Sequence, residues 1–311
     1  MQEIASSLLV ASRKSPFIHK MDRTPPGVVC PTYYVLSHGN GCPYGCDYCC
    51  LQLPLRNIRK PIVFDGRERM LEEVRRFLGR GRAWLLSAGE SSDSLALDHV
   101  AHLARDLVPL FARQDEGMLF PKEKQHKLLF VTKSANVQGL LEVNERANVV
   151  VSFSLNAPEV SVRYEHGAPH PYERLKAAVR CQQAGYEVRI RIDPIIPLEG
   201  WCEMYEPLLE RIESEMDVEG LRFTLGTIRH NPGLRECASE RGREWKVFSQ
   251  ANSREASDLR YRLPVALRRE AYGWFLERLP GQATVALCKE TEEVWGHLGL
   301  DSRNPRCNCA L

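Results

Sequence analysis

The sequence predicts an α/β protein built on a parallel β-sheet, and three observations carry that prediction. Apolar runs rich in β-branched residues alternate with amphipathic helical patterns along most of the chain. Such runs are typical of parallel strands whose two faces are both covered by helices. Polar residues stand at the ends of several runs, where parallel folds place their ligand sites. With 311 residues, 43% of them hydrophobic, the chain can bury one large core.

The predicted strands and helices alternate in chain order. A first strand at 33–37 leads into a cysteine-rich loop, and apolar spacing over 65–78 predicts the first helix. The next strands are predicted at 83–88, 128–132, 149–155, 188–195 and 221–225. The helical patterns between them lie near 94–113, 136–143, 171–185 and 201–215. A helix near 265–279, a short strand at 284–287 and a final helix near 290–298 close the fold.

We divide the chain into three parts. Residues 1–32 are polar and rich in proline and are expected to form an extended lead-in. Residues 33–228 hold the six β/α units, and residues 229–311 form a C-terminal segment. The arginine-rich part at 229–264 lacks an apolar period, which fits either a solvated loop or a lid that faces the substrate.

Composition excludes some classes of protein. A net charge of +2 gives no strong field toward nucleic acid or membrane, although a local basic patch would suffice for a nucleic acid. No apolar run approaches a membrane-spanning length, and the stretch at 8–11 is too short for a secretory signal. Eleven cysteines without an export signal indicate free thiols in a reducing compartment. We therefore expect a cytoplasmic protein with no membrane partner.

Three cysteines in one short loop are the strongest functional signal. Cys42, Cys46 and Cys49 have the spacing C-x3-C-x2-C, which keeps three thiolates within reach of one iron–sulfur cluster. Three ligands for four irons would leave one iron open. The alternatives are a structural zinc site or buried free thiols, but zinc usually takes a second cysteine pair or histidines, and no neat pair follows.

This loop resembles that of the radical S-adenosylmethionine (radical SAM) enzymes. The resemblance implies that Cys42, Cys46 and Cys49 hold a [4Fe-4S] cluster and that Tyr48 packs near the adenine of S-adenosylmethionine. In that superfamily one electron from the cluster cleaves S-adenosylmethionine to methionine and a 5′-deoxyadenosyl radical. The resemblance also implies a partial (β/α)6 TIM-like barrel with a short C-terminal extension, and a reductant such as flavodoxin or ferredoxin.

Polar residues at the strand ends are candidates for binding the cofactor. Ala88-Gly89-Glu90 looks like a variant of a glycine- and glutamate-containing motif of these enzymes, so Glu90 and the adjacent Ser91 are expected near the ammonium group. Lys133 suits the carboxylate, and Ser154 and Asn156 suit the ribose or the methionyl end. The alternatives are an exposed loop with a helix cap, a surface lysine and local capping of a strand end.

A closer resemblance is to the spore photoproduct lyase family. The matching motifs, in the same order and at similar spacing, are Cys49-Cys50-Leu51-Gln52, Phe130-Val131-Thr132-Lys133, Phe153-Ser154-Leu155-Asn156, Ala184-Gly185-Tyr186 and Glu199-Gly200-Trp201. In that family the radical takes a hydrogen atom from a thymine dimer lesion, and the dimer collapses to two thymines. The resemblance therefore implies a DNA or RNA substrate that carries a lesion.

The chain departs from this family at the hydrogen-donor position. A cysteine after the second strand returns a hydrogen atom in the family, but this chain has Glu90 in that loop. A carboxylic acid cannot replace a thiol in this role, because its O–H bond is far stronger than S–H. We therefore expect poor photoproduct repair unless another donor, such as Cys202 or Tyr261, takes the part.

The C-terminal cysteines suggest a second site. Cys307 and Cys309 form a C-x-C pair near the chain end, and Cys288 follows the last predicted strand. We expect the three sulfurs to lie within about 7 Å of one another and to hold an auxiliary iron–sulfur cluster or a soft metal ion. The alternative is a frayed tail with incidental cysteines.

Three functions remain open from the sequence. The first is a radical SAM lyase that acts on a nucleic-acid lesion. The second is the same scaffold acting on a peptide, a small molecule or a thiophilic element bound by the C-terminal cysteines. The third is a non-catalytic iron–sulfur or zinc protein, for which six β/α units with polar strand ends are an unexpectedly large scaffold.

Overall fold

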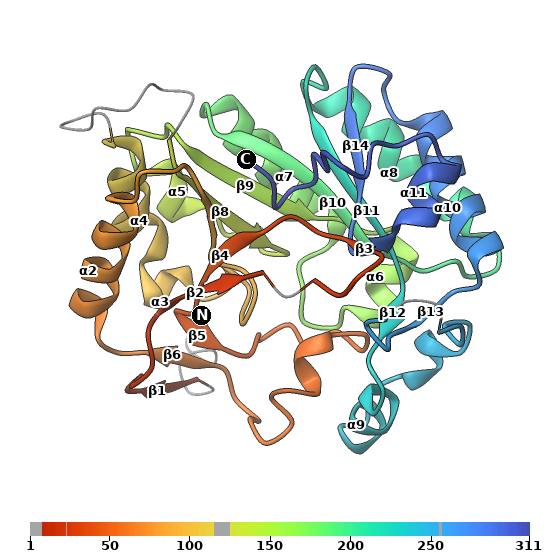
Figure 1. Cartoon of the computed structure of the whole chain (residues 1–311), viewed down its shortest axis with the longest axis horizontal. Helices are drawn as coiled ribbons and strands as arrows, with labels where there is room; N and C mark the ends of the chain where they lie inside the picture. The colour runs from red at the N-terminus through yellow and green to blue at the C-terminus, as the bar shows by residue number, and fades with distance from the viewer. Residues whose placement is uncertain (1–7, 23, 115–124, 255–256) are drawn as a thin grey trace.

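A parallel sheet forms the centre of the protein (Figure 1). The structure is a computed structural model that describes residues 8–22, 24–114, 125–254 and 257–311. The eight strands of this sheet lie in the order β14 (Thr284–Leu287), β11 (Arg222–Thr227), β10 (Glu187–Ile195), β9 (Val149–Ser154), β8 (Lys127–Thr132), β7 (Leu85–Ser87), β4 (Tyr33–Leu36) and β2 (Ile18–Met21). All neighbouring pairs from β4 to β14 are parallel, whereas β2 pairs antiparallel with β4. The predicted parallel sheet is therefore confirmed.

Helices cover the strands, as the alternating sequence pattern predicts. Their bounds are α2 (Arg67–Leu78), α3 (Asp98–Ala101), α4 (Leu103–Ala112), α5 (Gln138–Leu141), α6 (Pro158–Tyr164), α7 (Pro171–Gln183), α8 (Trp201–Glu215), α9 (Leu234–Glu240), α10 (Val265–Arg278) and α11 (Glu292–His297). The helix predicted at 201–215 matches α8. The pattern at 94–113 instead forms two helices, because His102 has a left-handed backbone with φ of 51° between them.

Three short pairings lie outside the main sheet. β1 (Leu9–Ala11), β6 (Ile62–Phe64) and β5 (Gly39–Asn40) form one small sheet. β3 (Val28–Val29) pairs with β15 (Glu290–Thr291), and β12 (Arg229–His230) pairs with β13 (Tyr261–Arg262). The 3₁₀ turns η1 (Cys50–Gln52) and η3 (Trp245–Phe248) complete the assigned elements. The pairing of β3 with β15 joins an N-terminal segment to a C-terminal one.

Both predicted flanking parts take part in the main sheet. β2 comes from the lead-in at 1–32, of which residues 1–7 and 23 lie outside the described residues, and β14 comes from the C-terminal segment at 229–311. The division into three parts stays a prediction. Among the described residues, no helix has the length and apolar character needed to cross a bilayer.

The C-terminal tail returns to the centre of the sheet, where it lies near β9 and β10 (Figure 1). Asn308 is buried there and donates to Ser152 Oγ at 2.7 Å and to the carbonyl of Ile190 at 3.0 Å. Thr224 Oγ1 donates to Asn308 Oδ1 at 2.8 Å. These bonds satisfy the buried amide of Asn308 and fix the tail within the fold.

Candidate functional site

A cavity of about 320 Å³ opens at the carboxyl ends of the parallel strands. Its wall takes residues from successive strand ends: Glu90 after β7, Lys133 after β8, Ser154 in β9, Asp193 in β10, Thr227 in β11 and Cys288 after β14. Cys42, Cys46 and Cys49 line the same cavity from the loop that follows β5. The structure thus brings the predicted cluster ligands and the polar strand ends to one place.

The backbone of the cysteine loop is held in a tight turn. Gly41 and Gly45 have φ of 83° and 61°, a conformation that favours glycine. Gln52 Nε2 donates to the carbonyl of Asp47 at 2.8 Å and to that of Cys46 at 3.3 Å. Gln52 is the last residue of the motif Cys49-Cys50-Leu51-Gln52, and these two hydrogen bonds explain its presence there: it holds the backbone of the cysteine loop.

The three loop thiols fit an iron–sulfur cluster. Burial raises the pKa of Cys46 to about 12 in the absence of a bound cation, and it also raises the pKa of Cys42 and Cys49. Iron would reverse these shifts, because a coordinated thiol is deprotonated. The described residues contain no group of three His, Cys, Asp or Glu side chains placed to hold a metal ion. A cluster distributes its ligands over different irons, so the loop suits a cluster better than a lone zinc ion.

The segment at 164–167 clamps the loop through its backbone. Asp47 N donates to the carbonyl of Tyr164, and Gly167 N donates to the carbonyl of Tyr44, each at 2.9 Å. A Cβ added at Gly167 would lie 2.8 Å from the Tyr44 carbonyl oxygen and 3.0 Å from its Cα. Only glycine allows the two segments to approach so closely.

Glu165 provides the side-chain part of this clamp. Its fully buried carboxylate pairs with Lys133 Nζ at 3.0 Å and with Arg174 Nη2 at 2.5 Å, and Tyr48 donates to it from the cysteine loop. Burial alone would raise the pKa of Glu165, but Lys133 and Arg174 outweigh burial and hold the pKa well below its usual range. Glu165 is therefore ionised, and it connects the cysteine loop to the end of β8.

Sequence reasoning missed both Glu165 and Arg174. Each lies among other charged residues close in sequence, such as Arg163 and Glu173, so neither spacing nor composition marks it. The one available signal is Tyr48: a buried tyrosine hydroxyl needs a hydrogen-bond partner, which indicates that some polar residue must lie beside it.

The predicted cofactor-binding residues divide into two groups. Glu90, Lys133, Ser154 and Tyr48 line the cavity. Glu90 accepts a hydrogen bond from Tyr33 at 2.9 Å, and Lys133 Nζ lies 5.7 Å from the centre of the Tyr48 ring. Their predicted contacts with S-adenosylmethionine stay predictions.

Ser91 and Asn156 lie behind the cavity wall. Ser91 Oγ donates to the carbonyl of Gly39 at 2.8 Å, so it supports the loop. Asn156 Nδ2 donates to the carbonyl of Pro194 at 3.1 Å and to Glu165 at 3.3 Å. Asn156 is therefore placed to position other residues of the wall.

Neither predicted alternative hydrogen donor lines the cavity. Cys202 lies in the first turn of α8. Tyr261 lies in β13 and stacks on His230, with ring centroids 4.9 Å apart and planes inclined by 20°. His230 lines the cavity and Tyr261 does not, so Tyr261 lies behind the His230 ring.

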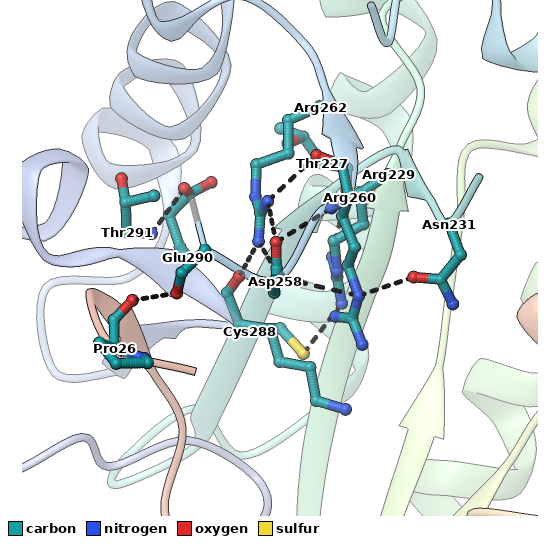
Figure 2. A network of polar contacts seen from close by, with 12 residues as sticks. Pro26, Thr227, Arg229, Asn231, Asp258, Arg260, Arg262, Cys288, Glu290 and Thr291 are labelled. Carbon is teal, nitrogen blue, oxygen red and sulfur yellow. Dashed lines mark hydrogen bonds and ion pairs between the residues drawn. The ribbon is translucent and has the colours of Figure 1, made fainter. Parts of the chain in front are cut away.

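The arginine-rich segment is folded against the rest of the site (Figure 2). Arg229 pairs with Asp193 at 3.0 Å and donates to Cys288 Sγ at 3.3 Å. Arg260 Nε donates to Asn231 Oδ1 at 3.3 Å, and Arg262 pairs with Asp258 at 2.6 Å. Arg229, Asn231 and Arg260 also line the cavity, which favours the interpretation of this segment as a lid.

The three C-terminal cysteines lie on the wall of the same cavity. Arg191 donates to Cys288 Sγ at 3.5 Å and to Cys309 Sγ at 3.3 Å. A hydrogen bond between Cys307 and Cys309, helped by Arg191, lowers the pKa of Cys309 to about 6. Burial raises the pKa of Cys288 to about 12. A metal at these thiols stays a prediction.

Comparisons with known proteins point to one family. A family model described as spore photoproduct lyase matches residues 6–254. The spore photoproduct lyase of Bacillus subtilis (strain 168) is 29% identical over 216 residues, which cover 68% of this chain and 58% of that protein. The one from Geobacillus sp. (strain Y412MC61) is 24% identical over 261 residues, 82% of this chain and 72% of that protein. The chain thus spans little more than half the length of the Bacillus subtilis relative.

Solved structures confirm the fold. A spore photoproduct lyase complexed with dinucleoside spore photoproduct superposes with a TM-score of 0.76 at 21% identity, over 92% of this chain and 84% of that chain. A mutant with bound AdoMet and dinucleoside spore photoproduct gives a TM-score of 0.75 at 21% identity, over 91% and 83%. The predicted partial barrel is therefore confirmed.

Replacing Glu165 by glutamine should destabilise the protein in a pH-dependent way. Two buried cations would lose their counter-charge, so we expect a loss of about 3–5 kcal/mol at pH 7. Because the folded pKa of Glu165 is lowered, its stabilisation is present above the unfolded pKa of about 4.3 and is lost as the pH falls below it. Denaturant unfolding from pH 7 down to pH 3 should show the gap between wild type and Glu165→Gln narrowing. Glu159→Gln in α6 is the control, and a gap independent of pH would contradict an ionised Glu165.

Gly167→Ala should disturb the cysteine loop without a large effect on the fold. The added Cβ would meet the backbone of Tyr44, which cannot rotate away as a side chain can. We expect less iron and sulfide per chain after anaerobic reconstitution. Gly273→Ala, where a Cβ meets nothing within 4 Å, is the matched control. Equal iron content in both variants would show that the clamp does not shape the loop.

Proposed function

The chain belongs to the spore photoproduct lyase family, and from this we propose that it is a radical SAM enzyme acting on a nucleic-acid lesion. One observation carries the proposal: the three loop cysteines face the same cavity as the polar strand ends. The cavity lies where ligands bind in folds of this class.

Cys42, Cys46 and Cys49 would hold a [4Fe-4S] cluster, and S-adenosylmethionine would occupy the adjacent cavity. When bound, the cluster and S-adenosylmethionine supply a 5′-deoxyadenosyl radical. A reductant such as flavodoxin or ferredoxin would provide the electron. We place the protein in the cytoplasm, where such a cluster and free thiols stay reduced.

The wall residues have distinct binding roles in this proposal. The Glu90 carboxylate suits the ammonium group of S-adenosylmethionine, and Lys133, which has further N–H donors besides the one to Glu165, suits its carboxylate. The hydroxyl of Ser154 suits the ribose. Tyr48 is held by Glu165 so that its ring borders the cavity, as expected for a contact with adenine.

Cationic side chains support an anionic substrate. Arg260 and Lys289 line the cavity on the side of the C-terminal segment, beside Arg229, whose charge is paired with Asp193. A nucleic-acid backbone carries the charge that such residues bind. A related protein was solved with a dinucleoside photoproduct, which supports a thymine lesion as the substrate class.

The reduced, reconstituted protein should convert S-adenosylmethionine to 5′-deoxyadenosine and methionine. Cys42→Ala, Cys46→Ala and Cys49→Ala should each abolish the reaction, because each removes a cluster ligand. Chromatographic detection of 5′-deoxyadenosine measures it, with Cys181→Ala in α7 as the control. Retained cleavage of S-adenosylmethionine in any of the three loop variants would contradict the assignment of these cysteines as cluster ligands.

Glu90→Gln should weaken the binding of S-adenosylmethionine. Loss of a charge-assisted hydrogen bond is worth about 1.5–3 kcal/mol, so the dissociation constant should rise by roughly 10- to 150-fold. Equilibrium binding to the reconstituted protein measures this change. Tyr33→Phe, which removes the hydrogen bond to Glu90 but keeps the carboxylate, is the matched control. Unchanged affinity in Glu90→Gln would mean that Glu90 only supports its loop or contacts the substrate instead of S-adenosylmethionine.

A further inference from the structure

The cavity needs a hydrogen-atom donor that its Glu90 loop does not supply. Glu90 lies at the end of β7 with its carboxylate bonded to Tyr33. A carbon radical formed on the substrate takes a hydrogen atom readily from a thiol and not from a carboxylic acid. Cys202 and Tyr261 lie outside the cavity wall, so the donor is sought among the thiols that line it.

Five cysteines besides the cluster ligands line this cavity: Cys30, Cys50, Cys288, Cys307 and Cys309. Cys288 receives hydrogen bonds from Arg191 and Arg229. Cys50 is exposed, and Cys30 is half-buried. Cys30 and Cys309 also border a wider hollow of about 750 Å³. Cys307 and Cys309 differ from the others because both are buried, one on each side of Asn308.

The fold holds this pair of thiols in place. Asn308 between them is fixed to Ser152, Ile190 and Thr224. Arg189 Nη1 donates to the carbonyl of Asn308 at 2.9 Å. A tail anchored by its central side chain presents both neighbouring residues reproducibly, as a reacting group requires.

The pair also lies on the side of the cavity where the Glu90 loop ends. Cys309 Sγ accepts from Arg191 at 3.3 Å, and Cys309, Glu90 and Tyr33 all line the cavity. Tyr33 and Glu90 are themselves hydrogen-bonded. The tail therefore delivers thiols beside the loop in which this chain has a carboxylate.

We propose that the Cys307–Cys309 pair returns the hydrogen atom to the substrate radical, with Cys307 as the S–H donor and Cys309 as its thiolate neighbour. The inference rests on the proposed function and adds the donor to it. The step balances as R• + Cys–S–H → R–H + Cys–S•: one S–H bond breaks, one C–H bond forms, and no charge moves. The neighbouring sulfur shares the unpaired electron. One electron from the low-potential reductant that also serves the cluster, with one proton from solvent, restores the thiol.

A second metal site is the competing use of these thiols. Arg191 already contacts two of the three sulfurs and supplies the positive charge that a metal would bring. The geometry therefore favours free thiols over metal ligands.

The test follows solvent hydrogen into the product. The reconstituted protein is given dinucleoside spore photoproduct in D₂O, where thiol hydrogens exchange with solvent. Wild type and Cys181→Ala should give repaired dinucleoside with one deuterium. Cys307→Ser and Cys309→Ser should lose that deuterium and most of the repaired product while still forming 5′-deoxyadenosine, which also shows that they fold and hold the cluster.

Iron content gives a readout that is independent of turnover. Wild type, Cys307→Ser and Cys309→Ser should bind the same amount of iron and sulfide per chain. Loss of about half of the iron in the tail variants would reveal an auxiliary cluster and overturn the donor assignment. So would undiminished deuterium in both variants, or its loss in Cys202→Ala alone. A wild type that forms no 5′-deoxyadenosine would instead overturn the proposed function, and the donor with it.

Discussion

The buried carboxylate of Glu165 links the cysteine loop to the barrel. Tyr48 of the loop, Lys133 at the end of β8 and Arg174 in α7 all bind to it. A buried charge of this kind is tolerated only when its partners are complete, and removal of one partner leaves an uncompensated charge. The position of the loop over the strand ends is therefore fixed by one ionic network, and the placement of Lys133 and of the Tyr48 ring beside the cavity depends on it.

The opposite side of the cavity is built by the C-terminal part of the chain. β14 adds a strand to the sheet, Cys288 follows it, and the tail brings Cys307 and Cys309 to the same wall. The arginines of the segment that the sequence leaves open as a solvated loop form ion pairs inside the protein. Arg229 pairs with Asp193. Arg262 pairs with Asp258 (Figure 2). The two sides of the cavity thus come from segments far apart in the chain, the cysteine loop and the C-terminal part.

Local patterns predicted much of this arrangement. Apolar runs located the strands from β4 to β14, and the cysteine spacing located the cluster loop, because both signals lie within a few residues. The break at His102 was missed, since an apolar period does not report the backbone angle of one residue. Glu165 was missed because its partner Tyr48 lies 117 residues away, and such a contact leaves no local pattern. The cavity position of the tail thiols depends on Asn308 reaching Ser152, 156 residues away.

The central claim is that the cavity beside the three loop cysteines holds S-adenosylmethionine on a cluster with one open iron. Electron–nuclear double resonance on the reduced, reconstituted protein tests it directly, with S-adenosylmethionine labelled with ¹⁵N in its amino group. A ¹⁵N coupling to the spin of the cluster is expected, and it should be lost when the cofactor is omitted. A cluster signal that shows no ¹⁵N coupling at saturating cofactor would contradict it.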